Sequence, residues 1–133
     1  MKSKKVTQYS CDHCGKKKYT LHSMIVHEEH CTLNPDRKCR MCQLIGSDND
    51  IKTLLAMIPK DVEEEKALNI FDDVYVEFPE IINRKEILDA FLKMKEAADS
   101  CPACILAVVR QLKSKVVFNF NYKKEAMEVF ASF

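Results

Sequence analysis

The chain has 133 residues, 47% hydrophobic and 31% charged, which is typical of one compact globular domain with a small appended module. This composition excludes wholesale disorder, and the lack of a run of roughly 18 apolar residues excludes a membrane-spanning helix. The net charge of +1 hides basic ends around an acidic middle: Lys and Arg minus Asp and Glu give 9 − 4 = +5 for residues 1–45, 7 − 14 = −7 for residues 46–100, and 5 − 2 = +3 for residues 101–133.

Residues 1–8 are predicted to form a flexible basic tail. They carry charge without the apolar stretch of a signal peptide, so we expect a cytoplasmic protein, or a nuclear one if the source is eukaryotic. In a reducing compartment cysteines seldom form structural disulfides, and an odd count of seven resists complete pairing. The cysteines therefore indicate metal or redox chemistry.

Residues 9–33 contain the ligand spacing of a zinc site: C-x-x-C, twelve intervening residues, then H-x-x-x-C. Two cysteines on a tight knuckle present adjacent sulfurs, and a histidine and cysteine four residues apart share one helix face. Gly15 can take the positive φ that such a knuckle requires. His30 is an alternative fourth ligand, although its spacing fits a helix less well. The predicted ligands are Cys11, Cys14, His27 and Cys31.

This segment resembles the classical ββα zinc finger family, as a variant with three cysteines and one histidine. Tyr9 stands two residues before the first cysteine, and Met24 holds the usual leucine position three before the histidine. One departure is that Lys18 occupies the expected aromatic position, with Tyr19 displaced by one. The resemblance covers residues 9–31 and implies a ββα fold, a miniature core of Tyr9 and Met24, and a helix of the nucleic-acid-binding type.

The resemblance places the base-reading positions of that helix at Thr20, Ser23 and Val26. None of the three is an Arg, Asn or Gln able to make a bidentate contact with a base, and one finger covers only about three base pairs. We therefore do not expect sequence-specific DNA reading. Three lysines of the hairpin can contact phosphate, which needs charge alone, or can be solvated residues without a partner. These candidates are Lys16, Lys17 and Lys18.

Residues 34–133 are predicted to form a mainly helical zinc-binding domain with a short C-terminal strand, so that the chain belongs to the α+β class. Apolar residues at helical spacing predict a short helix over residues 51–58. Asp61 and Glu64 fit a capping box, which predicts a further helix over residues 61–71.

The rest of the domain shows a clearer periodicity. Residues 74–78 are a short strand or an extended linker, and both alternatives remain open. The strongest helical pattern spans residues 83–99, and a proline at the first helical position opens a helix over residues 102–112. Alternating apolar and polar residues predict a strand over 116–122, and residues 123–130 follow as a final helix.

The four remaining cysteines form two C-x-x-C pairs separated by 58 residues, and together they predict a closed four-cysteine zinc site. The second pair opens a helix, whose dipole and free N–H groups stabilise thiolates. Zinc here would join the start of the domain to its last third, so the chain is predicted to hold two structural zinc ions. The four residues are Cys39, Cys42, Cys101 and Cys104.

Two other arrangements of the cysteines are open. A cross-braced site, as in RING-like domains, would join Cys11 and Cys14 to Cys39 and Cys42, but the sequence spacings fit it poorly. The Cys-Pro-Ala-Cys motif at residues 101–104 also looks like the dithiol of thioredoxin-type oxidoreductases. Such a motif should follow a strand, whereas residues 83–99 are predicted to be helical, so metal binding is the preferred interpretation.

Only two glycines occur, so a phosphate-cradling loop is excluded, and neither a catalytic constellation nor a small-molecule substrate is indicated. The sequence therefore predicts a non-enzymatic, zinc-binding regulatory or adaptor protein that associates with nucleic acid through its basic finger and tail. The alternative is a protein-interaction module that regulates or inhibits a larger enzyme. A dithiol oxidoreductase is the third hypothesis.

Overall fold

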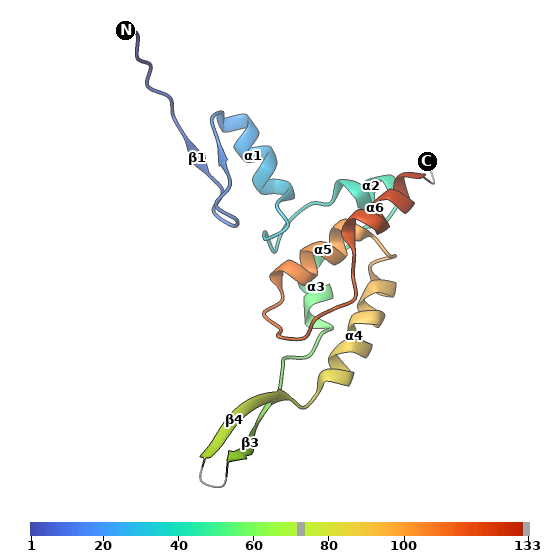
Figure 1. Cartoon of the computed structure of the whole chain (residues 1–133). Helices are drawn as coiled ribbons and strands as arrows, with labels where there is room; N and C mark the ends of the chain where they lie inside the picture. The colour runs from blue at the N-terminus through green and yellow to red at the C-terminus, as the bar shows by residue number, and fades with distance from the viewer. Residues whose placement is uncertain (72–73, 132–133) are drawn as a thin grey trace.

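The computed structural model describes the backbone of residues 1–71 and 74–131, and the side chains of residues 1–64 and 80–131. Figure 1 shows a small N-terminal unit beside a larger helical body, from which one long hairpin projects. Six helices and two antiparallel hairpins in the described residues agree with the predicted mainly helical α+β class. The elements are β1 (Tyr9–Ser10), β2 (Lys17–Lys18), α1 (Leu21–His30), α2 (Arg40–Ile45), α3 (Ile51–Ala56), β3 (Glu63–Phe71), β4 (Val74–Ile81), α4 (Arg84–Ala97), α5 (Pro102–Gln111) and α6 (Tyr122–Ala131).

The N-terminal unit, residues 9–33, consists of a short hairpin followed by a helix. β1 pairs antiparallel with β2, so that Tyr9 lies opposite Lys18. Thr20 begins α1 as its N-cap, because its side-chain hydroxyl accepts a hydrogen bond from the Ser23 backbone N–H at 3.2 Å. The order of strand, strand and helix is the one that the resemblance implied.

The segment that follows α1, residues 34–38, folds back onto the C-terminal end of that helix. The side-chain amide of Asn34 donates to the carbonyl of Glu28 at 2.7 Å, and the Arg37 guanidinium donates twice to the carbonyl of His30. The last carbonyls of a helix have no partner within the helix, so these side chains satisfy groups that would otherwise need water. The segment therefore closes the N-terminal unit as well as connecting it to the body.

The helical body, residues 39–131, has its core around α5, which contacts α2, α3 and α6. Ile105 and Val108 of α5 are fully buried. From α4, Ile87, Phe91 and Met94 enter the same core cluster at spacings of four and three, which place them on one helix face. Each such burial stabilises the fold by roughly 1.5–3 kcal/mol.

Four predicted helices of the body are confirmed with small changes at their ends. The prediction over residues 51–58 corresponds to α3, and that over 83–99 corresponds to α4. Those over 102–112 and 123–130 correspond to α5 and α6. α2 was not predicted, because its six residues, which lie between Cys39 and Gly46 and include Cys42, are too few to show a period.

The helix predicted over residues 61–71 is wrong. Residues 63–71 form β3, which pairs antiparallel with β4, so the strand alternative for residues 74–78 is the correct one. The expected capping residue Asp61 serves a different partner, a segment more than fifty positions along the chain. A β-branched and aromatic neighbouring strand is available, and its pairing outweighs a weak local preference for helix.

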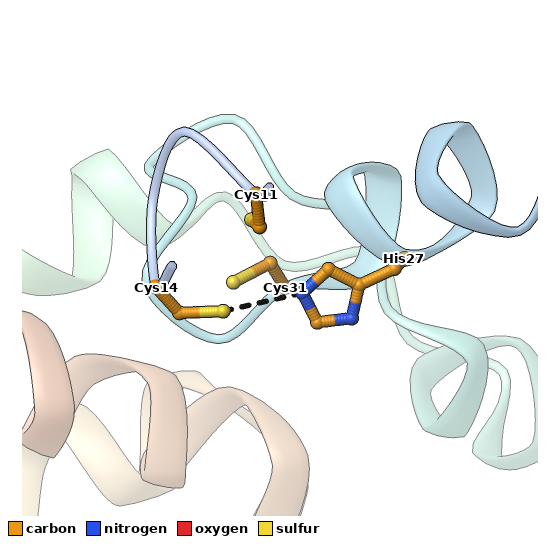
Figure 2. A group of neighbouring side chains, drawn as sticks. All are labelled: Cys11, Cys14, His27 and Cys31. Carbon is orange, nitrogen blue, oxygen red and sulfur yellow. Dashed lines mark hydrogen bonds between the residues drawn. The ribbon is translucent and has the colours of Figure 1, made fainter. Parts of the chain in front are cut away.

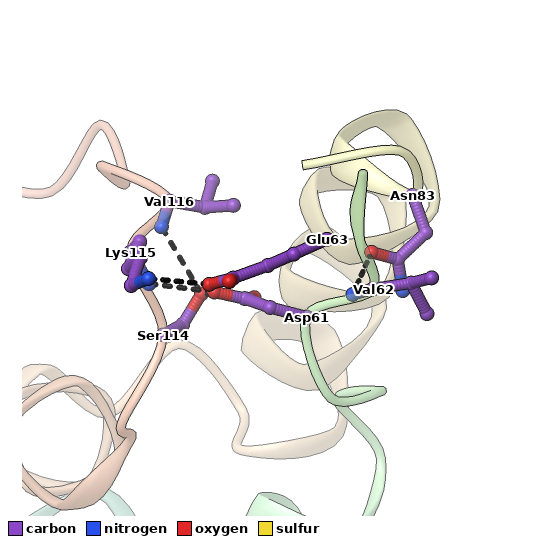
Figure 3. Close-up of polar contacts among 7 residues, drawn as sticks. All are labelled: Asp61, Val62, Glu63, Asn83, Ser114, Lys115 and Val116. Carbon is purple, nitrogen blue, oxygen red and sulfur yellow. Dashed lines mark hydrogen bonds and ion pairs between the residues drawn. The ribbon is translucent and has the colours of Figure 1, made fainter. Parts of the chain in front are cut away.

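Asp61 ties the base of this hairpin to the segment after α5 (Figure 3). Its carboxylate accepts a hydrogen bond from the Ser114 hydroxyl at 2.7 Å and another from the Lys115 backbone N–H at 2.8 Å. The Lys115 ammonium forms an ion pair with Glu63. The pKa of Asp61 lies below its ordinary value of 3.8, because two donors stabilise the charged carboxylate. The larger effect comes from the Lys115 backbone N–H and the next from the Ser114 hydroxyl.

Replacing Asp61 by asparagine is expected to lower stability at neutral pH and to change its pH dependence. A depressed folded-state pKa contributes stability that is present above the unfolded value, 3.8, and is lost as the pH falls through the folded value. Urea denaturation between pH 3 and 7 measures both effects. Asp89→Asn, an exposed change on α4, is the control. Identical pH profiles for the wild type and Asp61→Asn would contradict the role of this carboxylate.

The strand predicted over residues 116–122 is also wrong, since the described residues of this segment form no strand and α6 begins at Tyr122. The alternation itself is real: Val116 is buried, and Phe118 stacks on Phe91 with ring centroids 4.4 Å apart. A strand also requires a neighbouring strand to accept its backbone hydrogen bonds, and within the described chain only β3 and β4 form a sheet in the body. The segment therefore packs as irregular chain.

Candidate metal centres

The first candidate metal centre lies in the N-terminal unit (Figure 2). Two of its residues come from the turn between β1 and β2, and two from the last part of α1 and its C-cap. Their sulfur and nitrogen atoms all lie within 4.8 Å of one another, and Cys14 Sγ lies 3.2 Å from His27 Nε2. A group of this kind can hold a metal ion. The residues are Cys11, Cys14, His27 and Cys31.

Backbone hydrogen bonds explain why the two cysteines of the turn point the same way. The Cys11 N–H donates to the Lys16 carbonyl at 2.8 Å, and the Gly15 N–H donates to the Cys11 carbonyl at 2.9 Å. Gly15 has φ = 76°, a conformation that other residues rarely adopt, as the sequence predicted for this position. The turn therefore directs both sulfurs toward the same side.

A small apolar cluster surrounds this centre. Met24 is 3% exposed, and Tyr9 packs against it, in agreement with the miniature core that the resemblance implied. Tyr19 is 63% exposed and takes no part. Leu33, which we did not predict, packs against the cluster, and its apolar side chain two positions after Cys31 was the available signal.

The electrostatic surroundings favour the metal-binding form of His27. Burial, followed by the positive charges of Lys16 and Lys18, lowers the pKa of His27, so its imidazole is neutral at pH 7 and has a nitrogen lone pair free for a metal.

The Cys14 thiol has a lowered pKa as well. Burial by itself raises the pKa of Cys14. Hydrogen bonds involving the Lys16 backbone and the thiols of Cys31 and Cys11, together with the Arg110 charge, outweigh this effect, so the net shift is downward. The thiolate that binds metals is therefore favoured at this position.

His30, the alternative ligand, lies outside this group. Its Nδ1 atom is 2.7 Å from the carbonyl oxygen of Lys38, in the segment that closes α1. The structure thus brings Cys31 and not His30 to the centre, as the i, i+4 spacing from His27 favoured.

The second candidate centre joins the start of the body to α5 across 62 positions of sequence. Cys39 Sγ lies 3.6 Å from Cys101 Sγ, and Cys42 Sγ lies 3.2 Å from Cys104 Sγ. All four sulfurs lie within 4.8 Å of one another. The eight residues therefore meet in sequential groups, and the cross-braced pairing is not what this fold brings together.

Each C-x-x-C pair of the second centre begins a helix. Cys39 is the N-cap of α2, where its sulfur accepts a hydrogen bond from the Cys42 N–H at 3.4 Å, and Cys101 is the N-cap of α5 with Pro102 in the first turn. Free N–H groups at both helix ends stabilise negative charge on sulfur. Two helix ends thus converge on one cluster of thiols.

Asn49 supports this centre and was missed from the sequence. Its side-chain amide donates to Cys42 Sγ at 3.3 Å and to the carbonyl of Ala98 at 2.8 Å. Hydrogen bonds of this kind orient a ligand and stabilise a thiolate. A polar residue seven positions after Cys42 has no local signature, so only the fold reveals the contact.

The cluster shares charge unevenly among its thiols. Hydrogen bonds from Cys101 and Cys104 hold the pKa of Cys39 far below its ordinary value, whereas hydrogen bonding with Cys101 and Cys39, together with burial, raises the pKa of Cys104. Cys101 and Cys104 have no exposed surface. The thiolate form is therefore favoured at Cys39, the least buried of the four residues.

The far end of α5 contacts the N-terminal unit. Arg110 Nη1 donates to Thr32 Oγ1 at 2.6 Å, and the Gln111 amide donates to the carbonyls of Thr32 and Asn34 at 2.8 and 3.1 Å. Thr32 directly follows Cys31 of the first centre. One ten-residue helix therefore runs from the second centre to the edge of the first.

The candidate phosphate contacts lie around the same turn. Lys16 and Lys17 are exposed, and Lys18 is half-buried on β2.

Within the described residues, none of the helices is both long and apolar enough to cross a membrane. Comparisons with family models, with curated proteins and with solved structures find no match for this chain.

Proposed function

We propose that both centres hold zinc as structural ions. A set of three sulfurs and one nitrogen and a set of four sulfurs are the donor sets that tetrahedral structural zinc takes in proteins. Each set is closed, with four protein ligands and no position left for a substrate. The observation that supports this is the convergence of eight ligand atoms into two groups.

Metal analysis tests the stoichiometry. Two zinc ions per purified chain, and loss of the helical circular dichroism signal when a strong chelator removes them, are the expected results. One ion or none, or a chain that keeps its fold in chelator, would contradict the proposal.

We further propose that the chain is a non-enzymatic regulatory or adaptor protein that associates with nucleic acid through its basic N-terminal unit and tail. Support comes from the lysines at positions 16–18 in the hairpin and from the exposed lysines at positions 2, 4 and 5 in the tail that leads into it. Phosphate contacts of this type require positive charge and carry no base specificity.

The side chains of α1 favour non-specific binding. Of the positions that the resemblance assigns to base reading, Thr20 already caps the helix, and Ser23 and Val26 are too short or apolar for a bidentate contact. Affinity is therefore expected to depend on salt more than on base sequence.

Replacing Lys16, Lys17 and Lys18 by glutamine is expected to weaken this binding in proportion to the charge removed. The slope of log affinity against log salt should fall by about 2 to 3, at roughly 0.7–0.9 for each phosphate contact. Gel shift or fluorescence anisotropy between 50 and 300 mM salt measures the slope. The control triple variant Lys85→Gln, Lys93→Gln and Lys123→Gln removes the same charge from exposed positions of the body. A wild-type chain that binds no nucleic acid at low salt would remove the proposal.

The alternative, a protein-interaction module that regulates or inhibits a larger enzyme, is favoured by one observation. Large apolar side chains are exposed around the start of α1, at 63% for Tyr19, 57% for Leu21 and 55% for Ile25. Exposed apolar side chains that lie together are typical of protein–protein interfaces. Recovery of one stoichiometric protein partner would favour this function over the first. The dithiol oxidoreductase is disfavoured by the complete burial of Cys101 and Cys104, since an attacking thiolate needs access to its substrate.

A further inference from the structure

A groove of about 870 Å³ lies between the N-terminal unit and the helical body. Lys16, Lys18 and His22 line it from the N-terminal unit, while Arg40 of α2 and Arg110 of α5 line it from the body. These positions are distant in sequence and meet only because the C-terminal end of α5 lies against the loop after α1, as Figure 1 shows.

The groove is strongly cationic. Four of its lining residues are Lys or Arg, and no carboxylate side chain is among the lining residues, all of which belong to the described part of the chain. Cys14, His27 and Cys31 form part of its floor. Three thiolates with one zinc ion carry a net charge of −1, so the groove keeps 4 − 1 = +3 when the first centre is loaded. An anionic ligand with several charges fits such a site.

The two walls are held at a fixed separation. Arg110 and Gln111 donate to Thr32 and Asn34 in the loop after α1, with the shortest of these bonds at 2.6 Å. Because these bonds already join the two parts of the folded chain, binding does not have to bring them together first. Arg110 has further N–H groups beyond the one it gives to Thr32.

The body lies across the groove from the face of α1 that a duplex would need. Ser23 and Val26, which a DNA-reading helix would present to the bases, both line this groove together with Arg40 and Arg110. A helix enters a DNA major groove, about 12 Å wide, only when that face is free. A single strand has a narrower and more flexible backbone, so it can lie along the groove where a duplex cannot.

We propose that this groove binds the phosphodiester backbone of a single-stranded nucleic acid, with Arg40 and Arg110 of the body completing the cationic surface of the N-terminal unit. This rests on the proposed nucleic-acid association and adds the strand class and the residues of the second wall. Phosphates lie against the lysine and arginine side chains, and His22 at the rim of the groove adds a surface on which a base can stack.

The test uses the zinc-loaded full chain with fluorescein-labelled oligothymidine, oligouridine and a duplex of equal length. The double variant Arg40→Gln, Arg110→Gln is expected to lower the salt slope for the single strands by about 1.4, which is about a 25-fold loss of affinity at 0.1 M salt. The control, Lys93→Gln with Lys123→Gln, removes equal charge from exposed positions outside the groove and should change affinity much less.

Two further variants separate charge from structure. Thr32→Val removes the acceptor of the Arg110 hydrogen bond but keeps every cation and the Gln111 bonds to the two backbone carbonyls that join the walls, so it should bind nearly as the wild type does. Arg40→Gln alone leaves the α5 contact in place and should lose about fivefold. Zinc content and circular dichroism confirm that each variant is folded.

The outcomes distinguish the two proposals. If the wild type binds and the arginine double variant binds like the lysine control, the groove assignment is overturned while the association stands. If the duplex binds as tightly as the single strands, the strand class is wrong. If the wild type binds none of the three probes at low salt, both proposals fail together.

Discussion

Replacing Cys39 by serine is expected to release one of the two zinc ions and to unfold the helical body, while the N-terminal unit stays folded. Cys39 Sγ lies 3.6 Å from Cys101 Sγ, so its loss opens the link between α2 and α5. Structural zinc contributes about 10–16 kcal/mol in zinc-finger peptides, which is comparable with the whole stability of a typical domain, about 5–15 kcal/mol.

The burial of the remaining sulfurs strengthens this expectation. Cys42, Cys101 and Cys104 are at most 3% exposed and belong to the main core cluster. Without the ion, the three remaining thiol groups are buried with too few hydrogen-bond partners. The disturbance therefore reaches the core residues of α5 directly.

Metal content and thermal melting measure the outcome for Cys39→Ser. One zinc per chain, no cooperative melting of the body, and an N-terminal unit that still protects its amides from exchange are expected. Gln43→Ser, an exposed change on α2, is the matched control and should keep both ions. Two zinc ions and an unchanged melting curve in Cys39→Ser would contradict the long-range pairing.

Replacing His27 by alanine is expected to have the opposite pattern, with loss of the first zinc and unfolding of residues 9–33. Among the described residues, only Cys11, Met24 and Cys31 are buried in the small apolar cluster of this unit, and so few side chains cannot hold a fold without the metal. The body keeps its own core and its own zinc. Its melting temperature should fall by only a few degrees, because the contacts of Arg110 and Gln111 with the loop after α1 are lost.

His30→Ala is the matched control for this variant. His30 lies on the same helix but bonds to the Lys38 carbonyl, so its replacement should leave both zinc ions in place. A chain that loses zinc in His30→Ala and keeps it in His27→Ala would reverse the ligand assignment. Loss of the body's melting transition in His27→Ala would show that the two parts do not fold independently.

The first centre could be predicted from sequence because all of its parts are local. A turn of fixed length sets the two cysteines, and a single helical turn sets His27 and Cys31, so spacing alone specifies the geometry. The same locality made Tyr9 and Met24 recognisable. Leu33 escaped because it packs from beyond the end of the helix.

The second centre was predicted by elimination and not by geometry. Four cysteines were left, but nothing in their spacing of 58 residues requires that the two pairs meet. The meeting depends on α3, α4 and the core of α5, which return the chain to α2. Asn49, which bonds to Cys42 and Ala98, belongs to the same class of long-range contact.

The two wrong elements have one physical cause. Asp61 fits a helix cap locally, and residues 116–122 alternate as a strand does, yet backbone hydrogen-bond partners decide both cases. β4 lies beside residues 63–71 and makes them a strand. The segment around Phe118 has no neighbouring strand among the described residues, and the Phe118 ring packs on Phe91 instead. Local propensities amount to about 1 kcal/mol or less per residue, so available partners override them.

The sequence by itself determined the ligand types, the local geometry of the first centre and the periodic helices, since each depends on residues within one or two helical turns. Only the tertiary structure decided that the second pair of C-x-x-C motifs meets, that Asp61 closes a hairpin, and that Arg40 and Arg110 lie across a groove from Lys16 and Lys18. These contacts join positions dozens of residues apart, and they exist because burial of the α5 core folds the chain back on itself.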